Sequence, residues 1–172
     1  MAEFREYVAS CPGPKIVVVQ DLDKPEVLGS LWGEIQANTQ RALGCVGTIT
    51  DGAIRDVDEM RNAGFKAIAR RLCVGHAHVA PIHWNCEVEV FGCAVEPGRL
   101  IHADKHGFLV IPEEDEDRLL DASFFMDSNE CRTVIPAARS AAGKPAAEIV
   151  ESINAAGMQF ARNVEKKFGS EG

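Results

Sequence analysis

The sequence predicts an α/β fold, and three observations support that class. In the first half of the chain, short apolar or β-branched runs alternate with segments of helical periodicity. The middle of the chain combines polar–apolar alternation with turn residues, which is typical of antiparallel strands. Helical patterns dominate after Pro112. We therefore expect mixed sheets with flanking helices and a mainly helical C-terminal region over residues 113–172.

The first half is expected to contain three strands joined by two helices. The strands are expected at residues 16–19, 46–50 and 65–69, where β-branched and apolar residues cluster. The helices are expected at residues 30–43 and 57–63, and each of these patterns ends at a glycine, a common helix stop. This order of strand, helix and strand is typical of α/β domains.

The second half is expected to begin as antiparallel sheet and to end as helix. Residues 87–91 alternate in polarity, and residues 100–103 and 108–111 flank a polar turn that favours a hairpin. Acidic residues after Pro112 indicate a helix start, because carboxylates there complement the helix dipole. Pro136 is expected to interrupt the following region before a last helix over residues 146–168.

Composition limits the classes of function that the chain can have. It has 172 residues, 46% of them hydrophobic and 26% charged, which fits one soluble domain rather than two. The net charge of -8, without a stripe of basic residues, argues against a nucleic-acid partner. The sequence shows neither a secretory signal nor an apolar run long enough to cross a membrane. We therefore expect a cytoplasmic protein.

The six cysteines do not indicate a disulfide framework, because they show no close paired spacing. Residues 73–86 contain two cysteines and three histidines, which could in principle bind zinc. The spacing is irregular and contains no C-x-x-C knuckle. Packed cysteines and loop histidines are therefore the favoured interpretation.

Arg55 and Asp56 are the first candidates for an active site. They lie in a segment, residues 51–59, that is expected to form a glycine-opened turn between a strand and a helix. Ligands often bind where a strand leads into a helix in α/β folds. The alternative is that Arg55 and Asp56 form an ion pair that only stabilises the turn.

A second candidate site arises if the helix after Gly29 begins close to Gly33. Unsatisfied backbone amides of Glu34, Ile35 and Gln36 could bind a substrate carboxylate, as helix starts bind anions. The Glu34 side chain would then lie near that anion. The alternative is that Glu34 is an exposed acid stabilised by the helix dipole.

Two longer segments, residues 45–59 and 95–112, resemble the two signatures of the RraA-like family. That family includes class II pyruvate aldolases acting on 4-hydroxy-4-methyl-2-oxoglutarate and 4-carboxy-4-hydroxy-2-oxoadipate. The resemblance runs from about residue 16 to residue 112 and implies a swivelling β/β/α-type domain, here a single RraA-like domain over residues 1–172. Family members usually carry a longer N-terminal segment, whereas fifteen residues precede Ile16 in this chain.

The resemblance also assigns roles to individual residues. The aldolases share an acidic residue, twenty intervening positions, an Arg-Asp pair and an acid three residues further on. Glu34, Arg55, Asp56 and Glu59 match that spacing. By resemblance, Asp56 would bind a divalent metal, Mg²⁺ or Mn²⁺, Arg55 would contact the pyruvyl oxygen, and Glu34 would help to hold a catalytic water.

The implied function is that of a metal-dependent lyase that cleaves 4-hydroxy-2-oxo acids to pyruvate and also decarboxylates oxaloacetate. The implied assembly is a homotrimer or hexamer, in which a neighbouring subunit donates a further acid. Two alternatives remain open. One is a non-catalytic RraA-type regulator that binds an RNA-processing enzyme, and the other is an inactive paralogue whose shortened N-terminus leaves no pocket. The acid at Glu34 argues against the regulator, because the regulator-like pattern lacks it.

Overall fold

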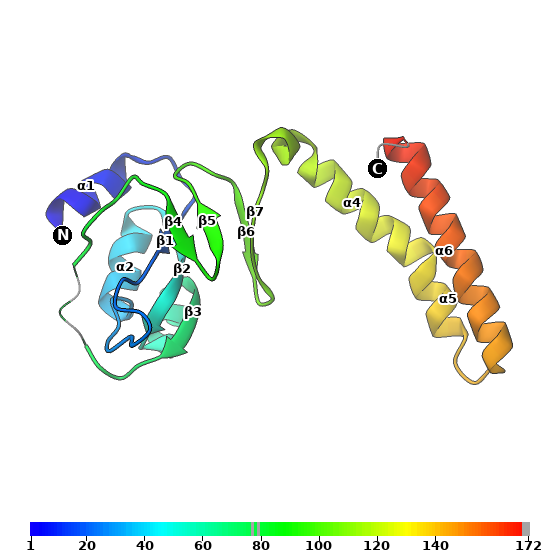
Figure 1. The fold of residues 1–172 in the computed structure, drawn as a ribbon, viewed down its shortest axis with the longest axis horizontal. Coiled ribbons are helices and arrows are strands. Elements are labelled where there is room, and N and C mark those ends of the chain that lie inside the picture. Colours follow the sequence, from blue (N-terminus) through cyan, green and yellow to red (C-terminus); the bar gives the residue numbers. More distant parts are fainter. Residues whose placement is uncertain (77, 79, 170–172) are drawn as a thin grey trace. The chain divides into compact units, whose positions relative to one another are not determined.

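The computed structural model describes residues 1–76, 78 and 80–169. The chain forms two compact units, Met1–Ile111 (unit 1) and Pro112–Gly172 (unit 2). Figure 1 shows that strands occur in unit 1 and that unit 2 is helical. The sequence predicts one domain over the whole chain, and the helical region predicted from residue 113 falls in unit 2. The predicted α/β class, with parallel and antiparallel sheets and flanking helices, is confirmed.

Unit 1 contains a three-stranded parallel sheet in the order β1-β2-β3. The strands are β1 (Lys15–Val19), β2 (Cys45–Ile54) and β3 (Lys66–Leu72). They are joined by α2 (Glu34–Ala42) and α3 (Val57–Asn62), as the alternation of patterns predicts. The central strand, β2, is buried along nearly its whole length, which explains its apolar composition.

The predicted turn at the start of residues 51–59 is wrong, because β2 continues to Ile54. Asp51 and Gly52 belong to this strand, and pairing with β3 resumes at Ala53 and Ile54 after a shift of register. Pairing with β3 before and after this shift keeps Asp51 and Gly52 within the strand. Arg55 therefore follows directly after the strand rather than lying within a long turn.

The helix predicted over residues 30–43 begins later, at Glu34. Gly33 precedes it in an extended conformation, with φ of −172°. Ser30 and Trp32 instead form isolated parallel bridges, Trp32 with Ile54 at the end of β2. The first residues of the apolar pattern thus extend the edge of the sheet rather than forming a helical turn.

An N-terminal helix that the sequence analysis did not predict, α1 (Ala2–Ser10), covers the core of unit 1. Its Phe4 and Val8 are buried in the main apolar cluster. Phe4 meets Trp84 edge to face, with ring centroids 6.3 Å apart. Trp32 stacks on Phe65 at 5.4 Å in the same cluster. This core lies between the parallel sheet and the helices that flank it.

Two hairpins complete unit 1. The first pairs β4 (Val88–Val90) with β5 (Cys93–Val95), whereas the sequence predicts one strand over residues 87–91. The chain reverses at Phe91 and Gly92, which have φ of 55° and 80°, the positive angles of a tight hairpin turn. The second hairpin pairs β6 (Ile101–Asp104) with β7 (Gly107–Val110), which confirms the predicted hairpin.

Unit 2 consists of helices. After the short η1 (Glu113–Asp115) follow α4 (Glu116–Arg132), α5 (Val134–Ser140) and α6 (Ala146–Phe168). The predicted interruption at Pro136 is displaced to Thr133, and Pro136 lies in the first turn of α5, where a missing N–H breaks no helical hydrogen bond. None of the helices in the described residues has the length and apolar character needed to cross a bilayer.

Candidate functional site

Arg55 and Asp56 connect the end of β2 to the start of α3. Asp56 precedes the helix in the left-handed conformation, with φ of 54° and ψ of 48°. Few residues other than glycine adopt this conformation, although aspartate tolerates it better than most. The unusual backbone at Asp56 turns the chain sharply between strand and helix, so that both charged side chains lie at the end of the sheet.

The Arg55 side chain is held in place by the segment before α2. Its Nη1 donates to the carbonyl and to the hydroxyl of Ser30, at 2.9 and 3.1 Å. Its backbone amide donates to the carbonyl of Trp32 at 3.0 Å. Ser30 is itself buried, and its hydroxyl donates to the Trp32 carbonyl at 3.0 Å. The guanidinium is therefore oriented by buried polar groups, and 16% of the side chain is exposed.

The Asp56 carboxylate lies at the start of α2. Its Oδ2 accepts a hydrogen bond from the backbone amide of Glu34 at 3.1 Å and lies 3.5 Å from Nε of Arg55. A carboxylate at this position complements the positive end of the helix dipole. One of the amides that the sequence analysis assigns to a substrate carboxylate is thus bonded to Asp56, while the roles expected for Ile35 and Gln36 stay predictions.

Gly33 allows this close approach of α2 to the charged pair. A Cβ at Gly33 would lie 2.6 Å from Oδ2 of Asp56 and 2.9 Å from Cζ of Arg55. Both distances are shorter than any normal contact, so the position requires glycine for reasons of space. In the sequence, Gly33 stands out only because it comes directly before the acid that begins a helix. Its close approach to Asp56 and Arg55 depends on the tertiary fold.

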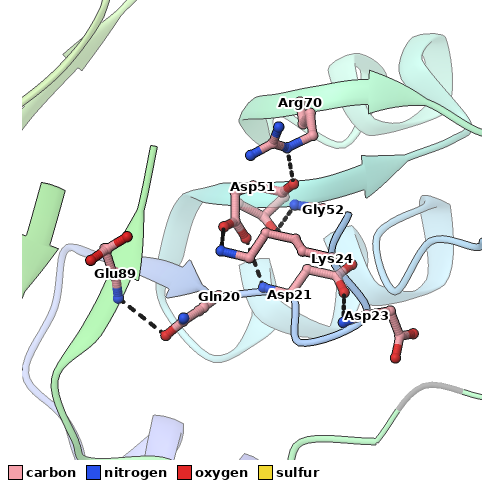
Figure 2. Close-up of polar contacts among 9 residues, drawn as sticks. Gln20, Asp21, Asp23, Lys24, Asp51, Gly52, Arg70 and Glu89 are labelled. Carbon is pink, nitrogen blue, oxygen red and sulfur yellow. Dashed lines mark hydrogen bonds and ion pairs between the residues drawn. The ribbon is translucent and has the colours of Figure 1, made fainter. Parts of the chain in front are cut away.

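The loop between β1 and Ser30 is anchored to β2 through Asp51, as Figure 2 shows. Asp51 is fully buried and accepts hydrogen bonds from the backbone amide of Asp21, at 2.7 Å, and from Nζ of Lys24. Its backbone carbonyl accepts one from Nε of Arg70 at 2.8 Å. A buried carboxylate needs such partners, since an unpaired buried charge is strongly unfavourable.

This anchored loop leads to the segment that holds Arg55. The Asp21 carboxylate lies over Gly52, where a Cβ would come within 2.5 Å of Asp21 Oδ2. At the start of the loop, Gln20 accepts a hydrogen bond from the amide of Glu89 at 3.1 Å, which ties the same loop to β4 (Figure 2). Asp51 was not predicted as the centre of this network, because the local pattern of strand and turn residues carries no sign that this carboxylate is buried.

The Asp56 carboxylate is the group of this site that could bind a divalent cation. Among the described residues, no group of three or more His, Cys, Asp or Glu side chains lies close enough to hold a metal. The Oδ1 atom of Asp56 accepts no hydrogen bond from the described residues, and 37% of the side chain is exposed. One free carboxylate oxygen with open access fits Mg²⁺ or Mn²⁺, which commonly keep water and substrate oxygens as most of their ligands.

The cysteine and histidine segment at residues 73–86 forms no such metal group in the described part of the chain. Cys73 donates weakly to backbone carbonyls of Leu28 and Gly75, and Cys86 is exposed. Elsewhere, burial raises the pKa of the Cys45 thiol, which packs as an apolar side chain in the core. These contacts agree with packed and loop cysteines.

The turn between β6 and β7 is organised by its own polar residues. Asp104 accepts hydrogen bonds from the backbone amide of His106 at 2.7 Å and from its ring at 3.0 Å. These hydrogen bonds lower the pKa of the exposed Asp104 carboxyl. The turn therefore has the structural role that hairpin turn residues usually have.

Residues 2–110 match the model of the RraA-like family, described as Aldolase/RraA. This chain belongs to the RraA-like family. The match covers almost all of unit 1, including Glu34, Arg55 and Asp56, and ends just before unit 2 begins.

Similar proteins in the family differ in length and in their names. Over 110 residues the chain is 26% identical to Protein DlpA of Legionella pneumophila, covering 63% of this chain and 18% of that protein. Over 121 residues it is 26% identical to a Halalkalibacterium halodurans protein named "Putative 4-hydroxy-4-methyl-2-oxoglutarate aldolase", covering 70% and 56%. The matched region thus spans less than a fifth of the Legionella pneumophila protein and little more than half of the Halalkalibacterium halodurans protein.

Solved structures confirm the fold. A protein from Pseudomonas syringae matches 90% of this chain and 68% of its own, with a TM-score of 0.68 and 22% identity. The RNA-processing inhibitor RraA from Thermus thermophilis matches 65% of this chain and 68% of its own, with a TM-score of 0.54 and 23% identity. At these identities the likeness establishes the RraA-like fold alone.

Proposed function

We propose that this protein is a divalent-metal-dependent lyase that cleaves 4-hydroxy-2-oxo acids to pyruvate and also decarboxylates oxaloacetate. One observation carries the proposal: Arg55 and Asp56 lie 3.5 Å apart at the start of α2, with a buried serine orienting the arginine. The name of the Halalkalibacterium halodurans relative adds support for an aldolase of this substrate class.

Both reactions break the bond between C3 and C4 of a 2-oxo acid. The electron pair of that bond passes to the pyruvyl fragment and forms an enolate, while C4 leaves as an aldehyde or ketone in the aldol case and as carbon dioxide in oxaloacetate. In the aldol case the proton of the C4 hydroxyl must also be removed. A proton added to C3 then gives pyruvate. The catalyst must therefore stabilise negative charge on the enolate oxygen.

Arg55 is suited to that stabilisation. Its Nη1 and Nε are occupied by Ser30 and Asp56, while Nη2 makes no hydrogen bond to the described residues. The fixed side chain can therefore present Nη2 to the enolate oxygen without reorganising during the reaction. A lysine at this position would offer a single charged nitrogen and would lose the contact with Ser30.

Asp56 would hold the cation through Oδ1, and Glu34 would hold a water that takes the proton of the C4 hydroxyl. The cation would supply Lewis acidity to the carboxylate and keto oxygens of the substrate. The Glu34 side chain is exposed at the first position of α2, and the backbone amide of the same residue is the one bonded to Asp56. A carboxylate there can bind a water within reach of the same ligand.

The proposal is tested by pyruvate release from a 4-hydroxy-2-oxo acid and from oxaloacetate, with Mg²⁺ or Mn²⁺ and with a chelator. Asp56→Asn and Arg55→Lys should each lower kcat/KM at least about a hundredfold, the size of effect seen when one charged transition-state contact is lost. Asp58→Asn, two residues along on the exposed surface of α3, is the matched control and should leave turnover within about twofold.

Turnover that is indifferent to chelator, or that survives both site substitutions, would exclude this mechanism. The family description covers aldolases and RraA proteins, so a regulator of an RNA-processing enzyme is the second candidate. That function would be favoured by a stoichiometric complex with such an enzyme together with no metal binding in a calorimetric titration. We further propose a homotrimer or hexamer, which the native mass will test.

A further inference from the structure

The helices α4 and α6 of unit 2 lie side by side and form an open hollow along their contact. Asp121 of α4 pairs with Lys167 of α6 at 2.7 Å, and Asn129 of α4 donates to the carbonyl of Phe160 at 3.1 Å. Rising positions along α4 thus meet falling positions along α6, so the two helices are antiparallel. The hollow has a volume of about 390 Å³, which is within the range of small-molecule sites.

Cations gather in this hollow. Arg132 of α4 and Lys166 and Lys167 of α6 line it, and none of the described residues that line it is acidic. Residues 112–172 carry twelve acidic and seven basic side chains, so the cluster runs against the composition of this part of the chain. Lys167 pairs with Asp121, whereas Arg132 and Lys166 make no ion pair to the described residues. Two cations of the hollow are therefore available to a ligand.

The acids nearest to these cations in sequence lie on other faces of their helices. They are Asp127, Glu130 and Glu165, all exposed, and at 3.6 residues per turn each lies roughly 150° around its helix from the lining residues. Helix dipoles are the alternative reason for the cations, since Arg132 and Lys166 stand in the last turns of α4 and α6. Because the two helices are antiparallel, their dipoles do not require these cations to line one hollow.

Neutral hydrogen-bond donors lie in the same hollow. Asn129 is buried, and its Oδ1 accepts a hydrogen bond from Nδ2 of Asn163 at 2.7 Å. Oδ1 of Asn163 accepts one from Gln159 at 2.8 Å, which leaves the second N–H of Asn163 without an acceptor among the described residues. The Ser128 hydroxyl, which also lines the hollow, makes no hydrogen bond to them. The hollow therefore combines two unpaired cations with two neutral donors.

We propose that this hollow binds the phosphate group of a small organic phosphate monoester. An arginine fork and a lysine ammonium commonly bind phosphate oxygens, and Ser128 and Asn163 would add neutral hydrogen bonds. A phosphate dianion balances both Arg132 and Lys166, whereas a single carboxylate would leave one of them unbalanced. Phe125, half-buried, lines the hollow and offers its ring to the organic part of the ligand.

The first test titrates the full chain with phenyl phosphate at constant ionic strength, followed by two-dimensional NMR. The side-chain amide of Asn163 should shift and saturate. Arg132→Gln and Lys166→Gln should each raise Kd about tenfold, because each removes one charged contact. Lys144→Gln removes the same charge from the exposed turn before α6 and should leave Kd within about twofold. Absence of saturation, or equal weakening by Lys144→Gln, overturns the proposal.

The second test separates the parts of the ligand and removes no cation from the protein. Benzoate, an aromatic anion of single charge, and inorganic phosphate, which lacks the ring, should each bind at least about tenfold more weakly than phenyl phosphate. Ser128→Asp places a carboxylate beside the cations and should weaken phenyl phosphate by a similar factor. Equal binding of benzoate contradicts recognition of a dianion, equal binding of inorganic phosphate contradicts the role of Phe125, and unchanged binding by Ser128→Asp contradicts the location.

Discussion

Unit 1 and unit 2 differ in how much apolar surface each buries. The main apolar cluster lies wholly in unit 1, where α1, α2, α3 and β2 all contribute side chains. In the described part of unit 2, Ala141 is the one buried apolar residue, and its other buried residues, Asn129 and Thr133, are polar. Apolar burial is the dominant favourable term in folding, so unit 1 has a large source of stability that unit 2, with its polar contacts around Asn129, largely lacks.

The largest effect that this difference predicts is at Phe65. Phe65→Ala removes a ring that stacks on Trp32 in the core of unit 1 and should lower the free energy of unfolding by about 3–5 kcal/mol. Phe124→Ala is the matched change in unit 2, at a 68% exposed side chain, and should change it by no more than about 0.5 kcal/mol. Urea unfolding followed by far-ultraviolet circular dichroism measures both, and equal losses would remove the distinction between the units.

Gly33 in unit 1 and Gly157 in unit 2 test the difference between the two units with smaller expected changes in stability. Gly33→Ala places a methyl group against Asp56 and Arg55 and should destabilise the protein by about 1–3 kcal/mol, because neither neighbour can move without losing its own hydrogen bonds. It should also abolish metal-dependent turnover. Thermal unfolding and the pyruvate assay provide the measurements, and an alanine variant of full stability would show that α2 can move away from the charged pair.

Gly157 in α6 should behave in the opposite way. Apart from its chain neighbours and the backbone of its own helix, no atom of the described residues lies within 4 Å of the place where its Cβ would stand. Gly157→Ala should therefore stabilise unit 2 by about 1 kcal/mol through helix propensity alone. Hydrogen exchange of the α6 amides would detect this as slower exchange. Faster exchange would contradict this prediction, because it would mean that the added methyl group disturbs a contact of α6.

The smallest effect concerns an exposed turn of unit 1. Hydrogen bonds from His106 lower the pKa of Asp104 below its ordinary value of 3.8, so the ionised carboxylate is favoured in the folded state. The resulting stabilisation is fully present above the unfolded pKa and is lost as pH falls through the folded one. The amide resonance of His106 should shift with a midpoint below 3.8 in an NMR titration. Asp104→Asn should remove that transition, and a midpoint above 3.8 would contradict the assignment.

Much of the fold was predictable because local patterns and tertiary structure agree. The β-branched run at β1, the hairpin of β6 and β7 and the long α6 have strong periodic or turn signals. By contrast, α1 has few apolar residues, and only its contact with the core explains why it forms. The turn at Phe91 and Gly92 was missed because an aromatic residue with positive φ has no sequence signature.

For the candidate site, the sequence by itself determined which chemical groups are available: a carboxylate next to a guanidinium after a buried strand, and an acid at the start of a helix. Those properties depend on residue type and local spacing. Only the tertiary structure decided that Asp56 bonds the amide of Glu34, that Ser30 orients Arg55 and that Asp51 is a buried anchor. These contacts join residues between 22 and 30 positions apart, and local periodicity carries no information about such distances.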